Sequence, residues 1–258
     1  MKITALLENT SAREDLRTEH GLSLYVEAAG HRILFDMGQS DLFYENAKTL
    51  GIDLSTVDLA VLSHGHYDHG GGLRRFLEIN ETAPVYIHRD AFLPHFHGAD
   101  KYIGLDPVLA AHPRILYTEG TVRIDGMLTL SDCNGRARIR PLDSAGLCEY
   151  RNGDLIPDGF LHEQYLLIEE AGRRVLISGC SHKGIRDVCA WFSPDVLVGG
   201  FHYSKHPTDG ALVEAARELS AFPTRFYTCH CTGVAQYEFM KQYLPHLSYL
   251  ACGESITV

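Results

Sequence analysis

The chain has 258 residues, of which 45% are hydrophobic, and it carries a formal net charge of −10. This composition supports a full apolar core. The negative charge argues against a general surface for nucleic acids, and no apolar stretch reaches the roughly 18 residues that a membrane span needs. We therefore expect neither nucleic-acid nor membrane partners.

The cysteines and the first residues bear on the compartment and the domain count. Seven cysteines are scattered along the chain, and their number is odd. Residues 1–8 resemble a first strand and lack the features of a signal peptide. We expect reduced thiols in a cytoplasmic protein rather than a disulfide framework. No linker, charge block or repeat divides the sequence, so a single domain over residues 1–258 is predicted.

Apolar runs and turn residues predict strands first, and then strands alternating with helices, which is typical of layered α/β architecture. Strands are expected at residues 2–7, 22–27, 32–36, 57–63, 84–88, 165–169, 173–178, 195–199, 225–229, 247–251 and 254–258. Helices are expected at residues 40–50, 72–78, 184–192, 210–220 and 233–243. Residues 93–115 show no clear period and are expected to pass over the site, with a lid at residues 94–97.

The most informative segment follows the expected strand at residues 57–63. It places three imidazoles and a carboxylate within six residues, ahead of a run of glycines: His64, His66, Asp68 and His69. Residues two apart in extended backbone point to the same side, so His64 and His66 can face one point. The turn after them brings the other two side chains to a second point. Imidazole and carboxylate ligands suit divalent ions, so the segment predicts a site for two metals.

The pattern His-x-His-x-Asp-His after an apolar strand resembles the signature of the metallo-β-lactamase-fold hydrolases. This resemblance implies an α/β fold built as a four-layer αββα sandwich, with metals at the edge between two sheets. It also implies that later strand ends deliver further ligands. By the resemblance, the ligands are His64, His66 and His162 for the first metal and Asp68, His69 and His230 for the second.

Cys180 departs from the family's pattern, which places a bridging aspartate at the aligned position. A thiolate is a good ligand for zinc or iron and could complete the second site. Alternatively, Cys180 is a small buried residue, and His182 or a water completes the shell. Cys229 and Cys231 flank His230 on an expected strand, where alternation would point both thiols away from the metal.

Further motifs narrow the resemblance to one branch of the family. Residues 179–185 (GCSHKGI), 199–202 (GGFH) and 230–233 (HCTG) are similar to segments of the dihydropterin ribofuranosyl-aminobenzene-phosphate synthases. Residues 18–23 (TEHGLS) and 35–40 (FDMGQS) fit the same branch. The match runs across nearly the whole chain. Because the branch is broad, it indicates the fold and the metal site more than the substrate.

Several residues outside the two ligand sets are candidates for the site. Asp36 is either a buried acceptor that fixes a ligand histidine or a cap of a turn. His182 is a candidate acid/base group, phosphate contact or extra ligand. His202 is expected in the pocket wall, and His20 lies either in the pocket or in a loop. Lys183 either contacts an anionic substrate or is an exposed lysine at a strand end.

These expectations imply a metal-dependent hydrolase in which a metal-bound hydroxide attacks an ester, lactone, thioester or phosphoester of a small molecule. Asp68 would orient the nucleophile, and His182 or a metal-bound water would protonate the leaving group. His202 and Lys183 would contact a substrate that could be anionic or phosphorylated. Zinc is the expected metal, although iron and manganese also fit such ligands. The alternatives are a pterin-phosphate-type synthase and a mononuclear iron oxygenase or sensor; the sequence does not indicate the oligomeric state.

Overall fold

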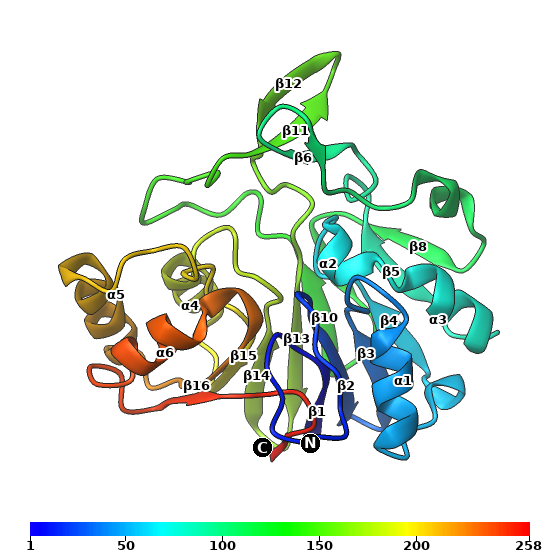
Figure 1. Ribbon diagram of the computed structural model, residues 1–258, viewed down its shortest axis with the longest axis horizontal. Coiled ribbons are helices and arrows are strands. Elements are labelled where there is room, and N and C mark those ends of the chain that lie inside the picture. The colour runs from blue at the N-terminus through cyan, green and yellow to red at the C-terminus, as the bar shows by residue number, and fades with distance from the viewer.

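The computed structural model describes residues 1–258 as two large β-sheets packed face to face, with a small third sheet above one end (Figure 1). In spatial order, the first large sheet contains β18 (Ser255–Thr257), β1 (Lys2–Leu7), β2 (Ser23–Ala28), β3 (His31–Phe35), β4 (Leu59–Val61), β5 (Val85–His88) and β8 (Ile115–Thr118). The second contains β17 (Leu247–Tyr249), β16 (Arg225–Thr228), β15 (Val196–Val198), β14 (Arg173–Ile177), β13 (Tyr165–Glu170), β10 (Leu128–Ser131) and β9 (Thr121–Arg123).

The helices cover the outer faces of the two large sheets. They are α1 (Leu42–Thr49), α2 (Tyr67–Gly70), α3 (Leu73–Ile79), α4 (Ile185–Phe192), α5 (Gly210–Ser220) and α6 (Val234–Met240), with 3-10 turns η1 (Leu54–Thr56), η2 (Pro107–Ala111) and η3 (His230–Thr232). The helices α1 and α3 pack on the first sheet, and α4, α5 and α6 pack on the second (Figure 1). The result is the four-layer αββα sandwich that the sequence predicts.

The central strands of both large sheets are buried on two sides, which explains their continuous apolar runs. In β2, Leu24 and Val26 face the core between the sheets, and Tyr25 faces the helices. In β14, Val175 faces the core between the sheets, and Leu176 faces the helices of the second sheet. Strand alternation therefore divides the apolar residues between an inner core and two outer cores.

The helix α5 shows how sequence fixes a helix and its buried face. Asp209 accepts the N–H of Ala211 and so caps the first turn. Leu212, Ala216 and Leu219 follow at helical spacing and are buried against the second sheet. These signals are local, and α5 has the bounds expected from the sequence. No helix of the structure is both long and apolar enough to cross a bilayer.

The strand β4 is shorter than the expected strand at residues 57–63. The N–H of Ser63 donates to Oδ1 of Asp36 at 2.7 Å instead of to a neighbouring strand. The chain then turns through α2, which the sequence did not predict because a single helical turn has no apolar period. This early exit from the sheet creates the loop that carries the metal-binding motif.

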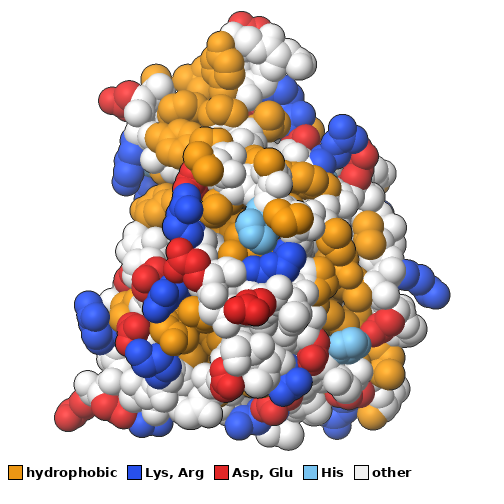
Figure 2. Space-filling view, turned by 90° about the vertical axis from the view of Figure 1, so that its right-hand side faces the viewer, with side chains coloured by type: hydrophobic (Ala, Val, Ile, Leu, Met, Phe, Trp, Pro, Cys, Tyr) orange, Lys and Arg blue, Asp and Glu red, His pale blue; other side chains and the backbone are white.

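The small sheet contains β12 (Asp154–Pro157), β11 (Leu147–Arg151), β6 (His95–His97) and β7 (Lys101–Tyr102), in this order. Its strands are two to five residues long and largely exposed, so they lack the apolar alternation by which strands are recognised. The expectation of an irregular segment at residues 93–115 is therefore wrong in part. Apolar side chains gather over the small sheet on the face seen in Figure 2. The exposed apolar residues of this sheet are Tyr102, Tyr150, Leu155 and Ile156.

The two ends of the chain meet in the first large sheet. The strand β1 pairs antiparallel with β18, and the ammonium group of Met1 donates to the carbonyl oxygen of Val258 at 3.3 Å. Both ends lie at the end of the sandwich opposite the small sheet (Figure 1). The candidate site lies at the other end, beneath the small sheet.

Candidate metal centre

The ligand loop, which we define as residues 63–69, leaves β4 and ends in α2. It is packed tightly at Gly65, where a Cβ atom would lie 2.2 Å from the carbonyl oxygen of Ala91. Only glycine allows this close approach. The loop therefore has a fixed path between His64 and His66, and the turn of α2 redirects the two ligand candidates that follow.

His64, His66 and His182 form the first group of buried donor atoms. The Nε2 atoms of His64 and His182 are 3.3 Å apart. Zn–N bonds of roughly 2.0–2.1 Å in a tetrahedral site place neighbouring donor atoms about 3.4 Å apart. The first group therefore has the spacing of a metal site, and it draws His182 from the loop after β14.

The second group combines nitrogen, oxygen and sulfur donors: Asp68, His69, Cys180 and His230. Nε2 of His69 lies 3.1 Å from Sγ of Cys180 and 3.2 Å from Nε2 of His230. Oδ2 of Asp68 lies 3.3 Å from Nε2 of His230. These distances between donor atoms also match those between neighbouring ligands of one metal ion. The second group is contiguous with the first through the ligand loop.

Asp36 orients ligand candidates in both groups. Oγ of Ser63 donates to Oδ2 of Asp36 at 2.7 Å and can therefore accept the Nδ1 proton of His64 at 2.8 Å. Nδ1 of His69 lies 2.7 Å from the same carboxylate oxygen. Protons held on Nδ1 leave Nε2 as the nitrogen available to a cation. Asp36 thus takes the first of its two expected roles, that of a buried acceptor.

Buried carboxylates also hold the backbone at the more distant ligand candidates. Oε1 of Glu163 accepts the N–H of His182 at 2.7 Å, and Oε1 of Glu8 accepts the N–H of His230 at 2.7 Å. Glu8, Asp36 and Glu163 are each 0% exposed. Buried negative charge is costly unless it is compensated, and cations in the two groups would compensate it.

The two groups differ in protonation. Burial, reinforced by neighbouring imidazoles, lowers the pKa of His64 and of His182 well below the usual value, so both rings are neutral. Burial opposes a charge on His69, but Asp36 and Asp68 raise its pKa to about 9. Burial likewise opposes ionisation of Asp68, but His69 and its neighbours hold its pKa well below the usual range. The first group is therefore neutral, and the second contains an ionised carboxylate.

His162 lies outside both groups, in contrast to the ligand set that the resemblance implies. Its ring centroid is 6.0 Å from that of His64, whereas the ring centroid of His182 is 4.8 Å away. Nε2 of His162 lies 3.2 Å from Oδ2 of Asp158, and its Nδ1 accepts the N–H of Gly65 at 2.9 Å. The donor atoms of His182 therefore cluster with those of His64 and His66, whereas those of His162 cluster with His66, His95 and Asp158 in another set that is spaced to hold a metal.

His95 and Asp158 are buried beside His162 and were missed in the sequence. Nδ1 of His95 lies 3.1 Å from Oδ2 of Asp158. The signal for His95 was the His-x-His spacing in residues 94–97, which was interpreted as a lid because no strand was expected there. The strand β6 is present and delivers His95 inward. For Asp158 the sequence held no signal except its place four residues before His162.

Lys183 is neither exposed nor directed into a cavity. It is 2% exposed, and its Nζ donates to the carbonyl oxygens of Asp132 at 2.6 Å and Glu163 at 2.9 Å. Burial lowers the pKa of Lys183 to about 8, although Glu163 partly offsets this. The expected contact with a substrate is not present, because backbone carbonyls hold the ammonium group in the interior.

The cysteines beside His230 occupy different environments. Cys229 is fully buried in the core between the sheets. Cys231 lines a cavity and lies with Cys180 and His230 in a group of candidate ligands, in contrast to the expectation that it points away. The strand β16 ends at Thr228 and η3 begins at His230, so strand alternation no longer applies. All seven cysteines are free.

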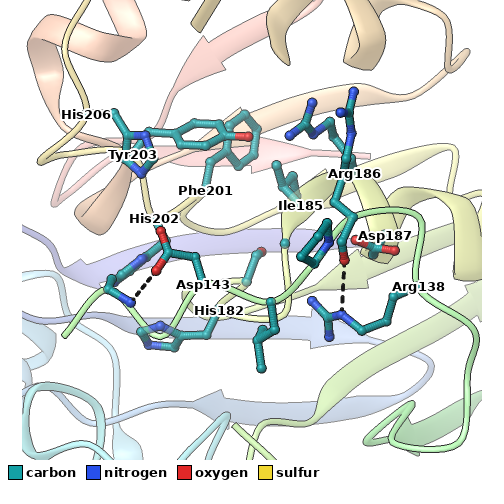
Figure 3. Close-up of a pocket in the computed structure, with 16 residues that line it drawn as sticks. Arg138, Asp143, His182, Ile185, Arg186, Asp187, Phe201, His202, Tyr203 and His206 are labelled. Carbon is teal, nitrogen blue, oxygen red and sulfur yellow. Dashed lines mark hydrogen bonds between the residues drawn. The ribbon is translucent and has the colours of Figure 1, made fainter. Parts of the chain in front are cut away.

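Two adjoining cavities open at the centre. One, of about 220 Å³, is lined by members of both groups and by Lys101 and Lys205. The other, of about 250 Å³, extends past His182 and His202 toward Arg138 (Figure 3). His202 lines both cavities, which agrees with its expected place in the pocket wall. The centre is therefore accessible to a small molecule.

His20 also lies in the pocket, which decides between its two expected positions. Its side chain is 55% exposed, and its Nε2 lies 3.2 Å from Oδ2 of Asp68. His20 therefore links a buried carboxylate of the second group to solvent.

The donor atoms fit divalent metals. Nε2 of His66 is buried and has no hydrogen-bond partner, which is costly for a polar atom. Imidazoles, a carboxylate and a thiol together suit zinc or iron, and metal binding would release the extra proton of His69. Seven residues of the motif and the later loops would supply the ligands: His64, His66 and His182 in the first group, and Asp68, His69, Cys180 and His230 in the second.

The fold and the site identify the class of the protein. The chain belongs to the metallo-beta-lactamase superfamily, whose family model matches residues 16–227. It is 27% identical to the 7,8-dihydropterin-6-methyl-4-(β-D-ribofuranosyl)-aminobenzene-5'-phosphate synthase of Methanocaldococcus jannaschii, over 93% of this chain and 90% of the relative. An uncharacterised protein of the same organism is 30% identical over 78% of each chain. A solved metal-dependent hydrolase of the β-lactamase superfamily superposes with a TM-score of 0.82 and 28% identity, covering 100% of this chain and 99% of that one.

Proposed function

We propose that the protein is a binuclear metal-dependent hydrolase of a small anionic ester, lactone, thioester or phosphoester. The observation that carries this proposal is the pair of contiguous donor groups at one cavity. The first cation would be held by His64, His66 and His182. The second cation would be held by Asp68, His69, Cys180 and His230. Zinc suits the mixed donor set best, and iron and manganese are compatible with it.

Divalent cations at these positions would lower the pKa of a bound water and polarise an electrophilic oxygen of the substrate. Side chains of the protein would orient the water and transfer protons. Asp68 is positioned to orient the nucleophilic water through Oδ2. His20, 3.2 Å from that oxygen and exposed to solvent, can carry a proton between Asp68 and the cavity. We assign His182 to the first cation, which was one of its expected roles, rather than to protonation of the leaving group.

Positive side chains at the cavities favour an anionic substrate. Lys101 and Lys205 line the cavity at the centre, and Arg138 lines the adjoining one. Fixed cations around a concave site raise the local concentration of anions. His202 lies between the two cavities, with its ring centroid 4.3 Å from that of His182, and is placed to contact the substrate. A phosphorylated or carboxylated small molecule fits these charges.

Metal analysis and a substrate panel test the proposal. Freshly purified protein should contain about two divalent ions per chain, as a binuclear centre requires. The metal-loaded protein should hydrolyse at least one substrate from the four classes. His64→Ala should lose a cation and the activity together, whereas His112→Ala, at a histidine outside both groups, should keep both. Full metal content with retained activity in His64→Ala would contradict the assignment.

A second candidate is a synthase that uses the same centre to form a bond to a pterin. It is favoured by the similarity to the methanopterin-related synthase over almost the whole of both chains. Incubation with a dihydropterin diphosphate and an aryl ribofuranosyl phosphate separates the two candidates. Release of diphosphate together with a joined product would support the synthase. Hydrolysis of either compound alone would support the hydrolase.

A further inference from the structure

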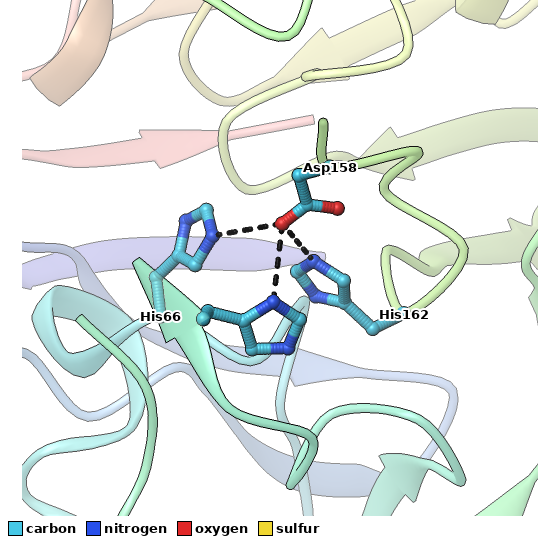
Figure 4. Close-up of side chains that lie close together, drawn as sticks. His66, Asp158 and His162 are labelled. Atoms are coloured by element: carbon cyan, nitrogen blue, oxygen red, sulfur yellow. Dashed lines mark hydrogen bonds and ion pairs between the residues drawn. The ribbon is translucent and has the colours of Figure 1, made fainter. Parts of the chain in front are cut away.

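A buried cluster of polar side chains lies beside the first donor group and has no part in the chemistry proposed above. The donor atoms of His66, His95, Asp158 and His162 are close enough together to hold a metal, and we call the last three residues the Asp158 cluster (Figure 4). The side chain of Asp158 is 0% exposed, and its Oδ2 lies 3.1 Å from Nδ1 of His95 and 3.2 Å from Nε2 of His162. Nε2 of His66 lies 3.7 Å from the same oxygen. The cluster therefore borders the ligand loop.

The hydrogen bonds of His162 determine where its proton lies. A backbone N–H can only donate, so Nδ1 of His162 accepts from Gly65 and carries no proton. A neutral imidazole then has its proton on Nε2, and that proton is donated to Asp158. Nδ1 of His162 thus uses its lone pair to accept a hydrogen bond, and Nε2 uses its proton to donate one. The ring has no nitrogen left for a cation.

Asp158 fixes this tautomer. Its Oδ1 accepts the N–H of Phe160 at 2.6 Å, which leaves Oδ2 to the imidazoles. Nitrogen atoms of three imidazoles lie within 3.7 Å of Oδ2, and these neighbours favour the ionised carboxylate in spite of its burial. An ionised carboxylate accepts and cannot donate, so it holds the proton of His162 on Nε2. Nδ1 of His162 is thereby kept as an acceptor for the ligand loop.

The contact of His162 with Gly65 defines the shape of the ligand loop. Gly65 lies between His64 and His66, and its Cα side is pressed against the carbonyl group of Ala91. On the other side, His162 accepts its N–H. A shift of this peptide would move both histidines of the first group, because each is the direct neighbour of Gly65 in the chain. Groups that orient ligands in this way typically change metal affinity by 10–100-fold when they are removed.

We infer that His162, held by Asp158, is a positioning residue for the ligand loop and not a metal ligand, and that His95 connects this support to the small sheet. The inference rests on the proposed metal centre. His95 comes from β6, Asp158 follows β12 directly, and His162 precedes β13. The small sheet is therefore part of the apparatus that shapes the first donor group, in addition to lying above it.

Two substitutions at one position separate a positioning role from ligation. His162→Ala removes the acceptor for the N–H of Gly65. His162→Gln supplies an amide oxygen that can accept the same N–H, but an amide replaces a zinc-type ligand poorly. Titration with Co²⁺, followed by visible absorption and by metal content, gives the affinity of each site. His97→Ala, at an exposed histidine of the same strand as His95 that lines the central cavity but belongs to neither donor group nor to the Asp158 cluster, is the matched control.

We expect His162→Ala to bind Co²⁺ at the first group roughly 10–100-fold more weakly, while His162→Gln recovers most of the affinity. Asp158→Asn keeps the shape of the side chain and removes its charge, so it should also weaken Co²⁺ binding at the first group. It provides the same test if His162→Ala does not fold. His97→Ala should bind as the wild type does.

Three results would overturn the inference. Unchanged affinity in both His162→Ala and Asp158→Asn would show that the cluster does not position the loop. Loss of one whole cation in both His162→Ala and His162→Gln would make His162 a ligand. If the alanine and glutamine variants bound Co²⁺ equally weakly, at full metal content, loss of the hydrogen bond from Gly65 would not be the cause of the weaker binding. A wild-type protein that binds no Co²⁺ would instead refute the proposed centre itself.

Discussion

The two donor groups lie side by side and share one loop, yet they differ in charge. The first consists of three imidazoles. The second combines two imidazoles with the carboxylate of Asp68 and the thiol of Cys180, and Asp36 lies 2.7 Å from the ring of His69. Attraction between a dication and an anionic ligand is strong where water is excluded. A single turn of helix is enough to place a neutral and a charged donor group within one short segment, and we expect the charged one to hold a cation more tightly.

Removal of both cations with a chelator should give the largest effect. A ligand bound only by the folded protein stabilises it by about 4 kcal/mol at 1,000 times its Kd. Its loss also removes positive charge from the neighbourhood of the buried carboxylates of Glu8, Asp36 and Glu163. Urea denaturation of the apo and the zinc-reloaded protein should show a clearly lower midpoint for the apo form. Equal midpoints would mean that no structural cation had been removed.

Cys180→Ser should weaken the second group alone. Replacement of a thiolate by a hydroxyl removes a strong ligand for zinc or cobalt, so the affinity should fall by at least about tenfold. In the Co²⁺ form, the sulfur-to-metal charge-transfer band should disappear while the first group still fills. Cys148→Ser, at a free cysteine of β11, is the control and should keep the band. A band that persists in Cys180→Ser would place the coordinating sulfur elsewhere.

Glu163→Gln should weaken metal binding at the first group alone, and by less than Cys180→Ser weakens it at the second. Oε1 of Glu163 accepts the N–H of His182 and Oε2 that of Lys183 at 3.0 Å, so an amide NH₂ would face one of these donors. An unsatisfied buried donor costs about 1–3 kcal/mol. We expect a lower free energy of unfolding and a weaker first site in the Co²⁺ titration, with the sulfur band unchanged. Equal weakening of both sites would show that the two groups are not independent.

Lys101→Ala should give the smallest effect. Lys101 is exposed at the cavity, and an exposed charge contributes at most about 1 kcal/mol to binding an anion. The inhibition constant of inorganic phosphate should rise severalfold at low salt, and the difference should shrink as salt is added. Lys2→Ala, at the opposite end of the sandwich, is the matched control. Equal inhibition of the wild type, Lys101→Ala and Lys2→Ala by phosphate would show that the anion binds away from Lys101.

The parts of the site that could be predicted from sequence are those encoded locally. The ligand loop follows a short apolar strand, and the spacing of His64, His66, Asp68 and His69 is sufficient to indicate a cluster of candidate metal ligands. The helix α5 was expected with its correct bounds because its cap and its apolar face are both local signals. The four-layer fold followed from the resemblance that these motifs carry, and the match of the family model supports it.

The parts that could not be predicted depend on contacts between distant segments. Both His162 and His182 adjoin strands of the second sheet, and sequence alone does not show that Gly65 and Asp158 occupy the ring of His162. Lys183 looked like a surface lysine because the carbonyl groups that hold it belong to other segments. The small sheet was missed because its short, exposed strands satisfy hydrogen bonds without forming an apolar face.

The pairing of β1 with β18 has a practical consequence. Since Met1 and Val258 adjoin each other at the end of the sandwich away from the small sheet, a label, an affinity handle or a surface anchor at either position would leave the cavity mouth unobstructed (Figure 1). A short bridge could join the two positions, and the polypeptide could be reopened at an exposed surface turn such as that at Ala171 and Gly172. Such a rearranged chain would keep every segment that shapes the cavity in its present spatial relationship.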